Sequence, residues 1–268
     1  MNKKTIIGQC KLTGQKGKFV KSHIIPKALT RPEEPGLPLM ESSDGTGNRR
    51  KWDSWYDQKL VIRKGENFLR DIDTSAILEL RKQQLLWSAF PDNGLESIDR
   101  FEGYETHGIR ELNEVKADII WLFIASIAWR ASASEMQEMR YFKLSEKIEE
   151  DLRKCIINSE AKFENFPTSL IQLSTVGIKH NHTPTLDMKS NPSVGGSEPI
   201  EVPFARIFVE SLICHFHISE NANQDFDNNP VFVGSTENLI VTCIDYEVSD
   251  QKVRIEKRNE IVFSNLSP

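Results

Sequence analysis

The sequence lacks an apolar run long enough to cross a membrane. The longest, residues 119–129, covers 11 residues and is flanked by Asp118 and Arg130, whereas a spanning helix needs about 20 residues. The first seven residues are a short basic and apolar stretch without the features of a secretory leader. We therefore expect a cytoplasmic protein without membrane contact.

Cysteine is scarce, and its four positions are widely scattered: Cys10, Cys155, Cys214 and Cys243. The spacing does not indicate a disulfide framework, and a chain of 268 residues can bury a sizeable core without staples. The Gly-x-x-x-x-Gly-Lys, Gly-x-Ser-x-Gly and His-Glu-x-x-His patterns are also missing. Their absence argues against a P-loop NTPase, a serine hydrolase of the nucleophile-elbow type and a zinc protease.

Basic residues are fewer than acidic residues in the chain as a whole, but they are concentrated near its start. The formal net charge is -5, yet residues 1–70 contain 15 Lys or Arg and 7 Asp or Glu, which gives +8, and the remainder carries -13. A basic segment of this size is typical of phosphate neutralisation by nucleic-acid binders. The alternative is an uneven distribution of charge over a solvated surface.

The pattern of apolar residues predicts an α+β protein in three parts: residues 1–90 as a basic finger, 91–180 as a helical core and 181–268 as an antiparallel β-rich region. Residues 115–133 are apolar nearly all round and predict a buried central helix. Residues 144–157 predict its amphipathic partner, with Ser145 as N-cap. Residues 57–70 could contain a helix start, and helical spacing continues over residues 71–87, where Asp73 or Thr74 is able to cap a helix.

Loops and strands are expected elsewhere. Residues 6–20 suggest a short hairpin, residues 30–48 and 180–199 suggest loops rich in Pro, Gly or Asn, and residues 220–229 suggest a polar loop. In the C-terminal part, the segments ARIFVE, LICHFHI, NLIVTCID and QKVRIEK alternate or are β-branched and predict strands. His215 and His217 share one face of such a strand, which could approach His180 and His182 around a metal or simply be solvated.

One stretch near the start combines a half knuckle with a histidine motif. It reads CKLTGQKGKFVKSHIIPKAL over residues 10–29 and is followed by WYDQKLVIRKGENFLRD over residues 55–71. Together they resemble the ββα-metal finger of the HNH endonuclease superfamily, in particular bacterial proteins with a Ser-His-Ile-Ile-Pro motif. The resemblance covers about residues 6–75 and extends weakly to IASIAWRASAS.

The resemblance implies phosphodiester hydrolysis with a divalent metal, Mg or Mn. His23 is the candidate general base, because a neutral imidazole suits removal of a proton from water. Asp57 stands where the family holds that imidazole in its useful tautomer. Glu66, nine residues later, stands where the family has a metal ligand or an orienting group, so His23 and Glu66 are the predicted metal ligands.

The sequence departs from the family where structural zinc would bind. Of four knuckle cysteines only Cys10 remains, since the other three positions hold Thr13, Ile62 and Gly65. One thiol cannot hold a structural zinc, which needs about four ligands, so we do not expect one. We expect apolar packing to support the finger instead, through these residues: Leu12, Phe19, Leu60, Ile62 and Phe68.

Nucleic acid, DNA in preference to RNA, is the expected partner. The predicted contacts to it are the basic side chains around the motif: Lys18, Lys21, Lys27, Arg49, Arg50, Lys51, Arg63 and Lys64. Trp52, Trp55 and Tyr56 follow the Arg49–Lys51 triplet and could stack on an unpaired base or belong to the core. The acidic C-terminal part could hold a protein partner.

Two functions from different classes remain open on the sequence. The first is a metal-dependent HNH-like nuclease, for which the resemblance suggests a setting in bacterial defence against phage. The second is an inactive HNH-derived module that binds nucleic acid or protein within a multi-protein complex. Loss of cleavage on replacing His23 separates the two.

Overall fold

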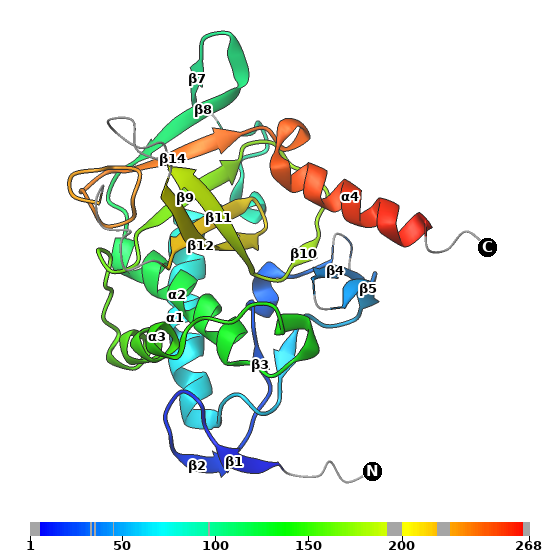
Figure 1. The fold of residues 1–268 in the computed structure, drawn as a ribbon. Coiled ribbons are helices and arrows are strands. Elements are labelled where there is room, and N and C mark those ends of the chain that lie inside the picture. The colour runs from blue at the N-terminus through cyan, green and yellow to red at the C-terminus, as the bar shows by residue number, and fades with distance from the viewer. Residues whose placement is uncertain are drawn as a thin grey trace.

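The computed structural model describes residues 6–32, 34, 36–44, 46–95, 97–191, 200–218 and 226–264. The fold is α+β, with three helices gathered on one side of a large sheet and the C-terminal helix packed against its other face (Figure 1). The helices are α1 (Arg63–Lys82), α2 (Ala117–Ala133), α3 (Glu146–Asn158) and α4 (Asp250–Ser264). The strands are β1 (Ile7–Gln9), β2 (Lys16–Lys18), β3 (Ser22–His23), β4 (Leu39–Ser43), β5 (Gly47–Lys51), β6 (Tyr56–Asp57), β7 (Asp99–Phe101), β8 (Tyr104–Leu112), β9 (Thr168–Leu173), β10 (Asn181–His182), β11 (Thr185–Asn191), β12 (Ile200–Val209), β13 (Leu212–His217) and β14 (Leu239–Ile244).

Helix α2 is the centre of the core, as its all-round apolar sequence predicts. Every residue from Ile120 to Ala133 is buried, and α2 packs against α1, α3 and the strands β12 and β13. Among the described residues, no helix is both long and apolar enough to cross a membrane.

Helix α3 confirms the predicted amphipathic partner. The Ser145 hydroxyl accepts a hydrogen bond from the Ile148 N–H at 3.3 Å, which caps the helix as expected. Leu152, Cys155 and Ile156 form its buried face.

Helix α1 starts within residues 57–70, as one prediction allowed, and not at Asp73 or Thr74. Both residues lie inside a single 20-residue helix that begins at Arg63. Its N-cap residue is Ile62, which supplies no side-chain hydrogen bond, whereas the buried Leu69, Ala76 and Leu80 anchor the helix on the core. Tertiary packing therefore stabilises the first turns without the capping residue that the prediction required.

The large sheet has seven strands in the order β11-β12-β13-β9-β14-β8-β7. It is mixed rather than antiparallel, because β14 runs parallel to β9. Three of its strands, β7, β8 and β9, come from the segment predicted as a purely helical core, so that expectation is wrong in part. The sheet draws its strands from both sides of residue 180.

Helix α4 replaces the strand predicted for QKVRIEK. Gln251 and Ile255 are buried while Val253 is exposed, so burial repeats every four residues rather than every two. Ser249 precedes the helix, and its hydroxyl accepts a hydrogen bond from the Lys252 N–H at 3.3 Å. The sequence of this segment is compatible with the period of a strand and with that of a helix. Burial of Ile255 in the apolar cluster that contains Trp87 favours the helix.

Two predicted loops contain strands. Strand β4 and the start of β5 lie within residues 30–48, and the turn of this hairpin uses Gly47 with a φ of +72°. Strands β10 and β11 lie within residues 180–199. Pro35, Gly45, residues 192–199 and residues 219–225 belong to predicted loops but lie outside the described residues.

Apolar packing holds the segment around Cys10, as predicted. Leu12, Leu60 and Ile62 are buried in the main core, with Phe19 and Phe68 packed against it. The predicted hairpin of residues 6–20 is present as β1 and β2. A Cβ added to Gly65 would lie 2.9 Å from the Cys10 sulfur, so only glycine leaves room for the thiol there.

Candidate functional site

The site begins with a short two-stranded ribbon. Strand β3 pairs antiparallel with β6, so that Ser22 lies opposite Asp57 and His23 lies opposite Tyr56. Because side chains alternate along a strand, Ser22 and Asp57 share one face of the ribbon and His23 and Tyr56 share the other. Helix α1 begins six residues after β6.

His23 is partly exposed and hydrogen-bonded to an acidic residue. Its side chain is 20% exposed, and Nε2 lies 3.3 Å from Oδ1 of Asp53. Lys21 also pairs with Asp53, and its ammonium lies 3.9 Å from the centre of the Tyr56 ring. The edge of the same ring faces the imidazole, with centroids 6.0 Å apart.

The surroundings favour a neutral imidazole and an ionised carboxylate. Burial is the main cause that lowers the pKa of His23, and Lys21 adds to it, while the hydrogen bond with Asp53 opposes both. Burial raises the pKa of Asp53, but hydrogen bonds from Lys21 and His23 outweigh it and leave that pKa below its usual value. At neutral pH the pair therefore consists of a neutral His23 imidazole, which can accept a proton, and an ionised Asp53 carboxylate that orients it.

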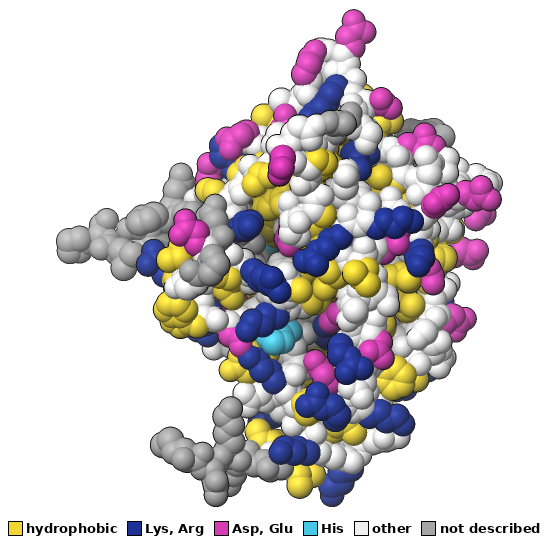
Figure 2. Space-filling view, turned by 180° about the vertical axis from the view of Figure 1, so that it is seen from behind, with side chains coloured by type: hydrophobic (Ala, Val, Ile, Leu, Met, Phe, Trp, Pro, Cys, Tyr) yellow, Lys and Arg dark blue, Asp and Glu magenta, His cyan; other side chains and the backbone are white. Residues whose placement is uncertain are grey.

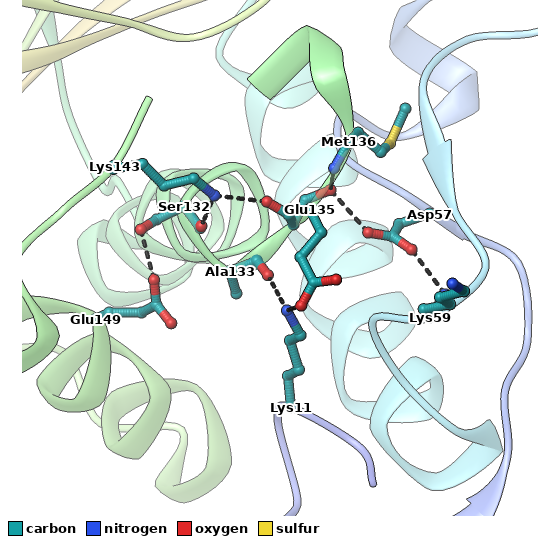
Figure 3. A network of polar contacts seen from close by, with 10 residues as sticks. Lys11, Asp57, Lys59, Ser132, Ala133, Glu135, Met136, Lys143 and Glu149 are labelled. Atoms are coloured by element: carbon teal, nitrogen blue, oxygen red, sulfur yellow. Dashed lines mark hydrogen bonds and ion pairs between the residues drawn. The ribbon is translucent and has the colours of Figure 1, made fainter. Parts of the chain in front are cut away.

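Asp57 makes a different set of contacts from those expected. Its Oδ2 accepts a hydrogen bond from the Ser134 hydroxyl at 2.7 Å, and its Oδ1 accepts one from the Lys59 N–H at 2.7 Å (Figure 3). These bonds tie β6 to the segment that follows α2. The carboxylate that hydrogen-bonds His23 is Asp53.

Glu66 lies in the first turn of α1, on the side of Ser22. Burial raises its pKa, while Ser22 and Arg130 act in the opposite direction. The Glu66 Oε2 and Ser22 Oγ atoms are both buried, and neither makes a hydrogen bond of good geometry to any described residue. Glu66 is not one of the main causes of the shifted pKa of His23, and His23 is not one of the main causes of the shifted pKa of Glu66.

A buried arginine of α2, Arg130, is hydrogen-bonded to the ribbon. Arg130 of α2 forms a two-pronged ion pair with Asp73 of α1, at 2.7 and 3.0 Å. It also donates a hydrogen bond to the backbone carbonyl of His23 at 3.0 Å. Arg130 therefore connects β3, α1 and α2 at one point.

Oxygen atoms suited to a hard cation are present, although they do not form a ready-made cluster. Among the residues that the structure describes, no group of three or more His, Cys, Asp or Glu side chains converges on one point. The unpartnered oxygens of Glu66 and Ser22 are donors of the kind that Mg²⁺ prefers. They fit a weakly held Mg²⁺ or Mn²⁺ that keeps much of its water.

A hollow of about 570 Å³ lies beside the His23–Asp53 pair. Asp53 and Tyr56 line it together with Glu41 and Trp52. Trp52 is 77% exposed, whereas Trp55 is buried in the core. Of these two tryptophans, only Trp52 is therefore accessible to a base. Burial raises the pKa of Glu41 to about 8, with Lys51 opposing the shift.

Asp53 and Glu41 were missed by sequence reasoning. Asp53 follows the basic triplet closely, and its distance of 30 residues from His23 corresponds to no motif spacing. Glu41 lies in a segment predicted as a loop, whereas it is buried on β4. Only the fold brings either residue to the site.

The predicted nucleic-acid contacts lie on the surface around this site. All of them are exposed except Lys51, which is half-buried in the hollow. Lys21 and Lys27 are the ones in contact with the pair, through Asp53. On the face shown in Figure 2, Lys and Arg side chains surround a visible histidine ring.

The C-terminal histidines do not form a solvated strand face. His217 is 5% exposed, and burial lowers the pKa of His215 to about 3 and that of His217 to about 4. His180 stacks on Phe208 and contacts Gln251 rather than the other histidines. The described residues do not gather these imidazoles around one point.

Comparison of the chain with family models, with curated proteins and with solved structures gives no match. The assignment of function rests on the residues and their geometry.

Proposed function

We propose that the protein is a metal-dependent HNH-like nuclease that hydrolyses phosphodiester bonds, in DNA in preference to RNA. The observation that supports this proposal best is the partly exposed His23, held by Asp53 on a ribbon that leads into α1. The order strand, strand, helix is also that of the finger which the Ser-His-Ile-Ile-Pro motif resembles. Bacterial anti-phage defence is the setting that we propose from that resemblance.

His23 would act as the general base. Its lowered pKa leaves the imidazole unprotonated at neutral pH, ready to take a proton from water. The water oxygen then forms a bond to phosphorus while the bond from phosphorus to the leaving oxygen breaks. Asp53 would orient the imidazole and stabilise the imidazolium that forms.

Glu66, with the Ser22 hydroxyl beside it, is the proposed ligand of Mg²⁺ or Mn²⁺. The other predicted ligand, His23, lies on the opposite face of the ribbon, and the proposal assigns its free nitrogen to proton transfer. A bound cation supplies neutralisation of the charge that grows on the phosphate during displacement. Glu66 must be ionised to bind the cation, so we expect metal binding to weaken as the pH falls, and its raised pKa moves this loss to higher pH than for an ordinary glutamate.

The surface around the site suits a polyanion. Lys21, Lys27 and Lys51 lie next to Asp53, which places positive charge where a phosphate backbone would approach His23. The exposed Trp52 ring, at the same hollow, could stack on an unpaired base.

The test is cleavage of plasmid DNA and of RNA by the purified protein with Mg²⁺ or Mn²⁺. We expect cleavage that His23→Ala abolishes, whereas His107→Ala on the distant strand β8 leaves it intact. Cleavage that survives His23→Ala, or that persists fully in EDTA, would refute the proposed mechanism.

An inactive binding module is the second candidate, and the burial of Glu66 favours it, because burial opposes the ionised carboxylate that a metal requires. In that case the protein binds DNA, or a protein through its acidic C-terminal part, without cutting. Equal DNA binding by the unmodified protein and His23→Ala, with no cleavage by either, would support this second function.

A further inference from the structure

The seven-stranded sheet has an outer face, away from α2, that contains a buried arginine. Along β12, Ala205 and Ile207 point into the main core with α2. Arg206 lies between them and therefore points to the opposite face. Arg206 is only 5% exposed.

Arg206 lines a hollow of about 580 Å³ on this face. It makes no hydrogen bond or ion pair with any residue that the structure describes. Burial lowers its pKa to about 10, so the guanidinium still carries its charge at neutral pH. A buried guanidinium that faces a hollow and is not paired by any described residue is suited to bind an anion.

The other charged groups around the hollow leave a surplus of positive charge. Arg254 of α4 pairs with Asp187 of β11 at 3.0 Å, so these two charges cancel. Arg206 and Lys189 then remain against Asp250 alone. These five side chains therefore carry a net charge of +1, which suits an anionic ligand.

The remaining walls offer a neutral donor and an apolar surface. His215 lies opposite Arg206 in the strand register, and burial together with the Arg206 charge keeps its imidazole neutral. Its ring contacts Phe204, with centroids 4.5 Å apart. Phe204, Ile171 and Met188 provide apolar contacts for a carbon-containing or planar group.

We propose that this hollow binds a small organic phosphate of the size of a nucleoside monophosphate. The phosphoryl group contacts Arg206 and Lys189, and the organic part lies over Phe204 and Met188. A duplex is excluded as the ligand because Arg206 is almost completely buried. The site is on the opposite side of the sheet from α2, so it is independent of the proposed nuclease centre.

The experiment measures binding to the full chain by calorimetry, together with the shift in melting temperature. The probes are 5′-AMP, 5′-GMP, 5′-CMP, inorganic phosphate and citrate. We expect a nucleoside monophosphate to bind more tightly than inorganic phosphate or citrate. Arg206→Met should weaken that binding by at least about tenfold, while Arg140→Met, at an exposed arginine stacked on Tyr141, should leave it unchanged.

A second variant keeps the test decisive if Arg206→Met does not fold. Lys189 is exposed at the rim, so Lys189→Met should fold and bind several-fold more weakly. Absence of binding by all nucleotides, or equal binding to the unmodified protein and to Lys189→Met, would overturn the proposal. Citrate or inorganic phosphate binding as tightly as the nucleotides would overturn the assignment to an organic phosphate.

Discussion

At the scale of single residues, the proposed centre depends on which carboxylate holds His23. The carboxylate that accepts the hydrogen bond from His23 is that of Asp53, just before β6, and not that of Asp57, whose oxygens accept from the Ser134 hydroxyl and the Lys59 N–H. Asp53 is itself held by Lys21. The imidazole is therefore oriented by a surface ion pair rather than by the strand beside it.

Asp53→Asn should lower the cleavage rate by roughly 10- to 100-fold, since orientation of the base and stabilisation of the imidazolium are both lost. The hydrogen bond with Asp53 raises the pKa of His23, so its loss lowers that pKa further. The acid limb of the kcat/KM profile should then move to lower pH. Asp71→Asn, at an exposed position on α1, is the matched control, and an acid limb that moves to higher pH contradicts the assignment.

The raised pKa of Glu41 predicts that the free energy of unfolding depends on pH. Its pKa is about 8 in the folded protein and about 4.5 in the unfolded chain. Between these values the folded state binds more protons, so its stability decreases as pH rises through this window. At pH 8, Glu41→Gln should increase the free energy of unfolding by on the order of 4 kcal/mol and should flatten the pH dependence.

Urea unfolding at pH 5 and pH 8 measures this effect. Glu102→Gln is the control, because Glu102 is an exposed carboxylate between β7 and β8 and is not among the charges that shift the pKa of Glu41. An equal loss of stability with pH in the unmodified protein and in Glu41→Gln would show that another group titrates.

At the scale of elements, Arg130 joins β3, α1 and α2. Breaking a buried ion pair by removing one partner leaves the other charge uncompensated, at a cost of about 3–5 kcal/mol. Arg130→Met should therefore destabilise the protein by about that amount, as measured by urea unfolding. Adding Asp73→Leu should recover much of the loss, whereas additive losses in the double variant would exclude a coupled pair.

At the scale of the whole molecule, charge divides between the basic N-terminal segment and the acidic remainder. Neutralising the triplet with Arg49→Gln, Arg50→Gln and Lys51→Gln should weaken DNA binding similarly for all sequences. The slope of log K against log salt concentration should fall by about 2 to 3, because each phosphate contact contributes about 0.9. Neutralising Arg81, Lys82 and Lys116, away from the ribbon, is the control, and an unchanged slope for the triplet would remove β5 from the interface.

The expected fold class could be predicted because strong periodic patterns report burial directly. The segment that became α2 is apolar on all sides and could only be interior, and Ser145 marks the start of α3 through a local hydrogen bond. The QKVRIEK segment, in contrast, fitted two periods, and packing of Ile255 against a separate small core made it helical. Strand β8 was missed because its pairing with β14 joins residues more than 120 positions apart.

The buried helices, the basic segment and the prominence of His23 follow from the sequence alone, because composition and periodicity are local properties. The folded chain was needed to show that Asp53 rather than Asp57 reaches His23, that Glu41 is buried beside them, and that Arg206 lines a hollow in which no described residue pairs with it. Those facts depend on contacts between residues far apart in the chain. Burial then alters the charge and pKa of groups whose sequence neighbours carry no sign of it.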